Sequence, residues 1–170
     1  LAVSWPAKIM DKGGVRPQFH HVIDIAPTIY EAAGIVFPDT LNGVKQKPIE
    51  GVSMVYTFDD AAAPGHRRSQ YFEMFVNRAI YNDGWWAASR TGIPWESAPA
   101  KPIDPDTATW ELYHLDEDFS QANDLAARNP EKLRQLQDLW WAEAARYSVL
   151  PLDGRKTVRL SAELQGRPSL

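Results

Sequence analysis

The sequence predicts an α+β fold in which a small antiparallel sheet of about four strands packs against an amphipathic helix near the C-terminus. Short runs of aromatic and other large apolar residues between residues 69 and 115 indicate the strands. A hairpin signal separates two of these runs, and apolar residues recur at helical spacing after residue 130. A shorter helix is expected near the N-terminus. At 170 residues the chain is long enough to bury a core.

A short strand is expected at the start of the chain. Residues 1–5 are mostly apolar, and Pro6 stops the run, which is typical of a strand end. Residues 8–17 follow as a polar loop with two adjacent glycines. Neither a Met nor a basic region of the kind that opens a signal peptide precedes this run. We therefore expect a fragment or a processed product.

The helix near the N-terminus is predicted over Asp24–Gly34. Asp24 should cap the first turn through a side-chain oxygen, Pro27 is tolerated there, and Gly34 supplies a left-handed stop. The apolar residues at helical spacing are Ile25, Ile29, Ala32 and Ala33. Because the helix is short, packing rather than intrinsic propensity must hold it.

Residues 37–68 are expected to be mostly irregular. Prolines and Asn42-Gly43 interrupt residues 37–51, which predict a connection with at most one short turn. Residues 51–56 indicate a helical turn or a short strand, and residues 57–68 a loop.

Four strands are predicted at Ser69–Phe75, Arg78–Tyr81, Trp85–Ser89 and Trp110–Leu115. The segment Asn82-Asp83-Gly84 is a strong hairpin signal because these residue types tolerate positive φ. The last strand alternates, which places Trp110, Leu112 and His114 on one face. Residues 91–106, rich in proline and glycine, should form a loop.

The C-terminal helix is predicted to begin at Asn129-Pro130, an N-cap residue followed by proline at the first helical position. One apolar stripe should lie on the sheet, and its residues are Leu133, Leu136, Trp140, Ala144 and Tyr147. Pro151 ends the helical region. The expected organisation is one subdomain over 1–152, with residues 1–17 as edge strand and loop, and a polar tail over 153–170.

Composition and charge exclude several classes of function. A net charge of −4 without a cluster of Lys and Arg argues against nucleic-acid binding. No apolar run approaches the roughly 20 residues that span a bilayer, so no membrane segment is expected. The chain has no cysteine, which excludes disulfides and thiolate metal sites and leaves the compartment open.

Five motifs occur in a fixed order along the chain. They are AVSWPAKI, HHVIDIAPTIYEAAGI, IEGVSM with YTFDDA, QYFEMFVNRAIYNDGWWAASR, and WELYHLDEDFSQANDLA. This series resembles the C-terminal part of bacterial arylsulfatases, which are sulfatases of the alkaline-phosphatase superfamily, from residue 1 to about residue 152. The resemblance implies that the first strand belongs to the edge of a larger catalytic sheet, and that the partner is an upstream catalytic domain of the same polypeptide.

The resemblance also implies the chemistry of the parent enzyme. Such a sulfuric ester hydrolase would cleave sulfate monoesters, in particular aryl sulfates. It would use a formylglycine made from Cys or Ser in a C/S-x-P-x-R motif, with Ca²⁺ as Lewis acid. These parts lie N-terminal to the region recognised here. We therefore expect no catalytic residue, cofactor or metal in this chain, and no activity of the chain alone.

Two segments imitate catalytic motifs. Ser4–Lys8 approaches S-x-P-x-R but ends in Lys, and the strand ending in WP explains Ser4 better than a nucleophile does. Asp59-Asp60 could suggest a hard-cation site, but the loop supplies no third carboxylate or Asn nearby. Use in a cap or turn is the favoured interpretation of this pair.

The histidines offer one weak candidate for a functional role. His20-His21 precedes the first helix, where an imidazole could face the cleft of the parent enzyme, and His21 is the preferred candidate for lining it. Hydrogen bonding of the pair to backbone at the helix start is the favoured alternative. His114 is interpreted as a satisfied structural residue and His66 as solvated.

An aromatic set could form either a core or a surface that binds carbohydrate or aryl groups. Its residues are Tyr71, Phe72, Phe75, Trp85, Trp86, Trp95 and Trp110. Packing is the favoured interpretation. If the upstream domain is absent, part of this surface should be exposed and cause self-association.

Two other classes of function stay open. One is the tail of a phosphonate monoester hydrolase or phosphodiesterase of the same superfamily, which shares part of the C-terminal motif. The other is a standalone, non-enzymatic interaction module. The upstream sequence distinguishes them, because formylglycine chemistry needs C/S-x-P-x-R. The sulfatase resemblance implies a periplasmic or secreted parent.

Overall fold

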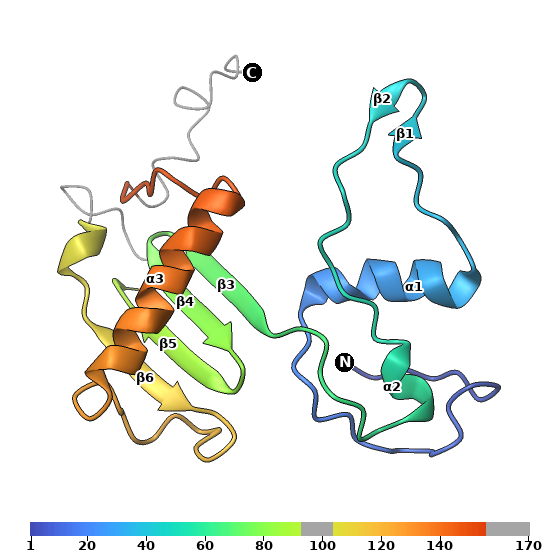
Figure 1. The fold of residues 1–170 in the computed structure, drawn as a ribbon, viewed down its shortest axis with the longest axis horizontal. Helices are drawn as coiled ribbons and strands as arrows, with labels where there is room; N and C mark the ends of the chain where they lie inside the picture. The colour runs from blue at the N-terminus through green and yellow to red at the C-terminus, as the bar shows by residue number, and fades with distance from the viewer. Residues whose placement is uncertain (93–103, 156–170) are drawn as a thin grey trace. The chain divides into compact units, whose positions relative to one another are not determined.

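The computed structural model describes residues 1–92 and 104–155 (Figure 1). The chain forms two compact units, Leu1–Arg68 and Ser69–Leu170, which we call the first and the second unit. The predicted organisation over 1–152 contained no such division. Residues 156–170 of the predicted tail lie outside the described residues. No helix in the described part of the chain is long and apolar enough to cross a bilayer.

The first unit contains two short helices and a small hairpin. Its elements are the 3-10 helix η1 (Val22–Asp24), α1 (Ile25–Ala33), β1 (Thr40–Leu41), β2 (Val44–Lys45) and α2 (Tyr56–Asp59). The helix predicted at 24–34 is confirmed, and Gly34 ends it at φ 66° in the left-handed region.

Two expectations for the first unit are wrong, and one stays a prediction. The edge strand expected at residues 1–5 would pair within an upstream catalytic sheet; among the described residues no segment pairs with it, and Lys8 N donates to Trp5 O at 2.9 Å where the chain turns back. Residues 37–51 are not fully irregular, since Asn42 and Gly43, at φ 51° and 80°, connect β1 to β2. Asp24 stands at the N-cap position of α1 without a side-chain capping bond.

The apolar face of α1 is exposed rather than packed. Ile25 is 36% and Ile29 58% exposed, whereas Thr28 is the buried residue of this helix. The expectation that packing holds α1 therefore fails for its apolar face within the described residues. Polar contacts of Asp24 and Thr28 take this role.

The second unit is a four-stranded antiparallel meander covered by one helix (Figure 1). Its elements are β3 (Ser69–Met74), β4 (Asn77–Asn82), β5 (Trp85–Ser89), the 3-10 helix η2 (Pro105–Thr107), β6 (Trp110–His114) and α3 (Pro130–Arg146). The strand order is β3-β4-β5-β6. The predicted α+β class, the four strands and the C-terminal helix are confirmed.

Two tight turns set the register of the meander. Asp83 and Gly84, at φ 45° and 82°, form the predicted hairpin between β4 and β5. Phe75 and Val76 form the turn between β3 and β4 at φ 51° and 62°, a conformation that a β-branched residue rarely adopts. Val76 N donates to the Glu73 carboxylate at 2.8 Å, which supports this turn.

The core lies between α3 and one face of the sheet. Leu136, Trp140 and Ala144 of the predicted stripe are fully buried. They pack with Ile80, Ala87, Trp110 and Leu112 of the strands. Trp140 also donates its indole N–H to Phe72 O at 3.0 Å, so the largest buried side chain has its polar atom satisfied.

Candidate functional site

A fully buried carboxylate organises the first unit. Both oxygens of Asp24 accept hydrogen bonds: from His21 N at 2.8 Å, from Val52 N at 2.7 Å, and from the Arg67 guanidinium. Arg67 Nε lies 2.9 Å and 3.1 Å from the two oxygens, and its Nη2 also donates to Oδ1. We call His20, His21, Asp24, Val52 and Arg67 the Asp24 cluster.

The environment of Asp24 keeps its carboxyl ionised. Burial by itself raises its pKa, but the hydrogen bonds from Arg67, His21 N and Val52 N outweigh burial, so the pKa lies below its ordinary value. The charge of Arg67 acts in the same direction. Removing one partner of such a pair leaves the other charge buried, which is strongly destabilising.

Two further contacts attach α1 to the segment after the hairpin. Thr28 Oγ1 donates to Asp24 O at 2.6 Å and accepts from Met54 N at 2.8 Å, both in buried surroundings. Gly51 permits a close backbone approach, because a Cβ there would lie 2.0 Å from Ile23 O. The start of α1 and residues 51–54 are therefore closely joined.

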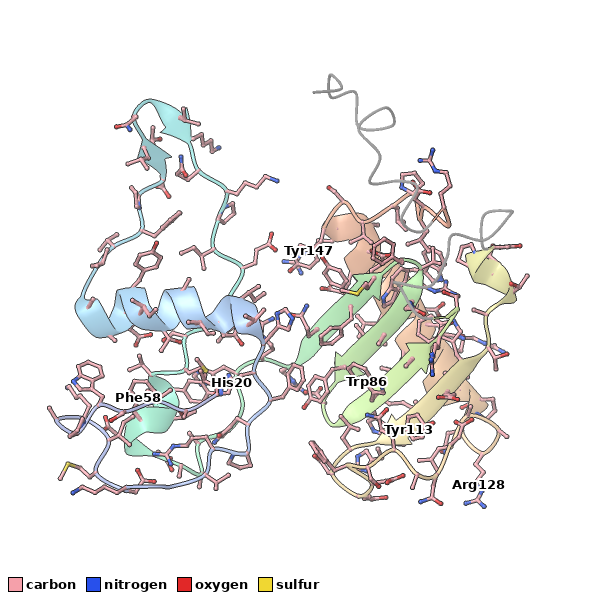
Figure 2. All side chains as sticks on the ribbon, turned by 180° about the vertical axis from the view of Figure 1, so that it is seen from behind. His20, Phe58, Trp86, Tyr113, Arg128 and Tyr147 are labelled. Carbon is pink, nitrogen blue, oxygen red and sulfur yellow. The ribbon has the colours of Figure 1, made fainter. Side chains whose placement is uncertain are left out.

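His20, labelled in Figure 2, belongs to the first unit. It lies beside Asp24 and is largely buried. Its Nδ1 is 3.8 Å from Asp24 Oδ2, beyond hydrogen-bond distance, and neither ring nitrogen has a partner in the described part of the chain. Burial lowers the pKa of His20, the Asp24 carboxylate opposes this, and Arg67 lowers it further. The net pKa is below the ordinary value, so the imidazole is neutral at neutral pH.

His21, the predicted cleft residue, contributes its backbone N–H to Asp24. Burial and the positive charge of Arg67 lower the pKa of its imidazole, against the opposing effect of Asp24. His21 and Asp24 also form a capping box at the start of η1, in which the His21 side chain faces the backbone N–H of Asp24. This arrangement agrees with the favoured alternative, a histidine paired with backbone at the helix start. A role of His21 in lining a cleft stays a prediction.

The other two histidines, His66 and His114, make contacts with aromatic rings. His66 is exposed, as predicted, but it also stacks on Tyr56 with ring centroids 3.7 Å apart. His114 packs on Trp85 at 4.5 Å, and its Nδ1 is 3.4 Å from the Glu117 carboxylate. These contacts agree with the structural role predicted for His114.

The two segments that imitate catalytic motifs, Ser4–Lys8 and Asp59-Asp60, show no catalytic arrangement within the described residues. Ser4 lies ahead of a turn at Pro6–Lys8 and not at a helix start. Asp60 Oδ1 accepts from Ala62 N at 2.9 Å, which is the turn use predicted for the Asp59-Asp60 pair. No group of three or more His, Asp or Glu among the described residues is arranged to hold a metal.

A pocket of about 810 Å³ opens beside these segments in the first unit. Ser4, Trp5, Arg16, His20 and Phe58 are among its lining residues. Arg16 is engaged elsewhere, with Asp11 and with Thr57 O at 2.6 Å, so its guanidinium mainly ties the first loop to α2.

The second unit contains a buried arginine that the sequence did not predict. Arg78 is 4% exposed, and its guanidinium carbon lies 5.0 Å from the Trp110 ring and 5.6 Å from the rings of Trp140 and Trp141. It donates to Pro105 O, and burial lowers its pKa. The seven tryptophans of the sequence indicate large aromatic contacts, but no sequence pattern indicates that Arg78 packs against three of them.

The aromatic set serves mainly packing. Trp110 is buried, Phe72 contacts Trp86 at 5.2 Å, and Tyr71 stacks on Tyr147 at 5.4 Å. Figure 2 shows Trp86 and Tyr113 on the sheet face opposite α3. Burial is the main cause that raises the pKa of Tyr113 to about 12, and the 3.0 Å hydrogen bond that its hydroxyl donates to Glu111 acts in the same direction. Trp95 lies outside the described residues.

Comparison with known proteins gives partial similarities. No family model matches the chain. One similar solved structure is a sulfatase, designated 6S-sulf, described with glycosaminoglycan metabolism by Bacteroides thetaiotaomicron (17% identity, TM-score 0.44, 70% of this chain and 24% of that one). A second is a sulfatase in complex with its substrate D-glucosamine-2-N,6-O-disulfate (17% identity, TM-score 0.48, 76% and 24%).

The chain thus spans about a quarter of the length of the solved structures it matches. At these identities and TM-scores, the similarity assigns neither a family nor an activity to the chain.

Proposed function

We propose that this chain is the C-terminal part of an arylsulfatase, bracing a catalytic domain formed by upstream residues of the same polypeptide. The observation that carries the proposal is the ordered series of five motifs over residues 1–152. The longest of them, QYFEMFVNRAIYNDGWWAASR, corresponds to β3, β4 and β5. This motif therefore spans three consecutive strands rather than isolated residues.

The exposed face of α1 supports a docking role. Six apolar residues on or beside this helix are at least one-third exposed, and we call them the α1 apolar surface: Val22, Ile23, Ile25, Ile29, Ile35 and Val36. Val22, Ile25 and Ile29 are spaced three and four residues apart, so they share one side of the helical stretch. Clustered exposed apolar residues are typical of surfaces that another part of a protein covers.

In this proposal the reaction belongs to the upstream part of the polypeptide. Formylglycine and Ca²⁺ there would supply the nucleophile and the Lewis acid for hydrolysis of aryl sulfates. This chain would shape one wall of the substrate cleft, with His21 as the candidate lining residue. Alone it would be inactive.

Sequencing the gene upstream of the Leu1 codon tests the proposal directly. An in-frame C/S-x-P-x-R preceded by a pair of Asp residues would support it. A start codon with no sulfatase-like sequence before it would overturn it and favour a standalone interaction module.

Activity of the full-length polypeptide then identifies the reaction. The assay compares an aryl sulfate, an aryl phosphonate monoester and an aryl phosphodiester as substrates. Preference for the sulfate supports the proposal, whereas preference for either phosphorus ester assigns the chain to the related hydrolases. A variant lacking the residues of this chain should lose activity, because the catalytic sheet loses its support.

A further inference from the structure

Three separate segments of the first unit meet at one buried charge. The Asp24 carboxylate accepts hydrogen bonds from His21 N in the segment before α1 and from Val52 N in the segment after the β1–β2 hairpin. It also accepts from Arg67, which lies 43 residues later in the chain. Arg67 also donates to Glu50 O at 3.3 Å, which joins the second and third segments. Release of the Asp24 carboxylate would therefore break the bonds by which it joins all three segments.

The charges around Asp24 balance only while the histidines are neutral. One carboxylate faces one guanidinium, and three imidazoles lie nearby. The charges of Asp24 and Arg67 act on both His20 and His21, and His66 also lowers the pKa of His20. The Tyr56 ring lies 5.9 Å from His20 and 3.7 Å from His66. Protonation of His20 and His21 would change the net charge of the cluster from zero to +2.

The Asp24 carboxylate is already occupied. Its oxygens accept from Arg67, His21 N and Val52 N, and His20 Nδ1 lies 3.8 Å away. A protonated His20 would have to compete with Arg67 for Asp24, which would break the buried ion pair of Asp24 and Arg67. Either arrangement weakens the junction.

We propose that the Asp24 cluster is an acid-sensitive junction: protonation of His20 and His21 releases the start of α1 from residues 50–52 and Arg67, and the first unit opens while the second stays folded. This inference is independent of the proposed function. The second unit carries a single histidine, His114.

The direction of the pH effect follows from proton linkage. The pKa values of His20 and His21 lie below 6.5 in the folded state, so the open state binds more protons in mildly acidic solution. Opening is thus suppressed above about pH 6.5 and grows as the pH falls. Each extra proton bound raises the opening constant about tenfold per pH unit until the folded-state pKa is reached.

Hydrogen exchange of the full chain, followed by mass spectrometry from about pH 8 to about pH 5, tests the proposal. After correction for intrinsic exchange rates, peptides covering α1 and residues 50–56 should lose protection on acidification, while those covering β4, β5 and α3 keep it. Unchanged or increased protection of α1, or simultaneous loss in both units, would overturn the proposal.

Matched histidine variants assign the effect to the cluster. His20→Gln should reduce the acid-induced loss of protection at α1, and His20→Gln with His21→Gln should abolish it. His114→Gln, the control, should behave as the wild type. A full acid response in the double variant would contradict the proposal.

NMR titration of the wild-type imidazoles guards against a variant that does not fold. His20 and His21 should titrate below the ordinary histidine pKa of 6.5, and the α1 amide signals should change over the same pH range. Titration of His20 and His21 without a change at α1 would also overturn the proposal.

Discussion

Different interactions stabilise the interior of each of the two units. The second unit has an apolar core between α3 and the sheet, which includes the fully buried Ile80, Leu112 and Trp140. In the first unit only Met54 and Phe58 are buried apolar residues among those described. The first unit depends instead on polar side chains that bind distant backbone, as Arg16, Gln18, Asp24 and Thr28 do.

This difference shows how much each unit relies on other parts of the protein. Burial of apolar area stabilises a fold with little dependence on pH, whereas a buried charged network is sensitive to the loss of one partner or the gain of one proton. The first unit also leaves the α1 apolar surface exposed. We therefore expect it to be the less stable unit of the chain.

The largest expected effect tests the apolar core. Trp140→Ala removes a fully buried indole and its hydrogen bond to Phe72 O, and should lower the free energy of unfolding of the second unit by about 3–5 kcal/mol. Urea unfolding followed by tryptophan fluorescence measures it. The exposed Arg134→Ala on the same helix is the control, with a change within about 0.5 kcal/mol. Equal free energies of unfolding for the two variants would contradict the assigned core.

The next effect tests the polar network of the first unit. Asp24→Asn breaks the ion pair between the fully buried carboxylate and Arg67 and should cost about 3 kcal/mol, measured by hydrogen exchange of α1. Protection of β4 and β5 should stay unchanged.

The same substitution predicts a pH dependence with a definite sign. Because the folded-state pKa of Asp24 is lowered, its ionised form stabilises the first unit above the ordinary value of 3.8, and this stabilisation is lost as the pH falls through the folded-state pKa. Asp24→Asn should remove this step from the acid unfolding curve. A curve of unchanged shape would show that Asp24 does not carry it.

A moderate effect is expected for the buried arginine of the second unit. Arg78→Lys keeps the charge but loses the planar contact with Trp110, Trp140 and Trp141, and should cost about 2 kcal/mol. Thermal unfolding followed by near-UV circular dichroism measures the change. A stability equal to that of the wild type would show that stacking on the tryptophans contributes little.

The smallest effect on stability is expected at the exposed face of α1. Ile29→Ser should change the free energy of unfolding by no more than about 0.5 kcal/mol, because the side chain is 58% exposed. We propose that the isolated chain self-associates through the α1 apolar surface, and Ile29→Ser should then reduce the association measured by analytical ultracentrifugation. Leu41→Ser, on the β1–β2 hairpin, is the control and should not reduce it.

Local patterns predicted most of the second unit. Alternation placed the strands within one or two residues, Asp83-Gly84 placed a hairpin, and the spacing of Leu136, Trp140 and Ala144 identified the buried face of α3. Such predictions succeed because neighbouring strands and a following helix bury one another's apolar faces with little help from distant residues.

The contacts of the first unit required the tertiary structure. The sequence around Asp24 predicted an N-cap, but its partners Val52 and Arg67 lie 28 and 43 residues away, and no periodic pattern marks such pairs. The sequence by itself determined α1, the four strands of the second unit and α3, because those elements depend on local propensity and apolar spacing. Only the tertiary structure decided that Asp24 is buried and Ile29 exposed, because burial depends on which distant segments meet.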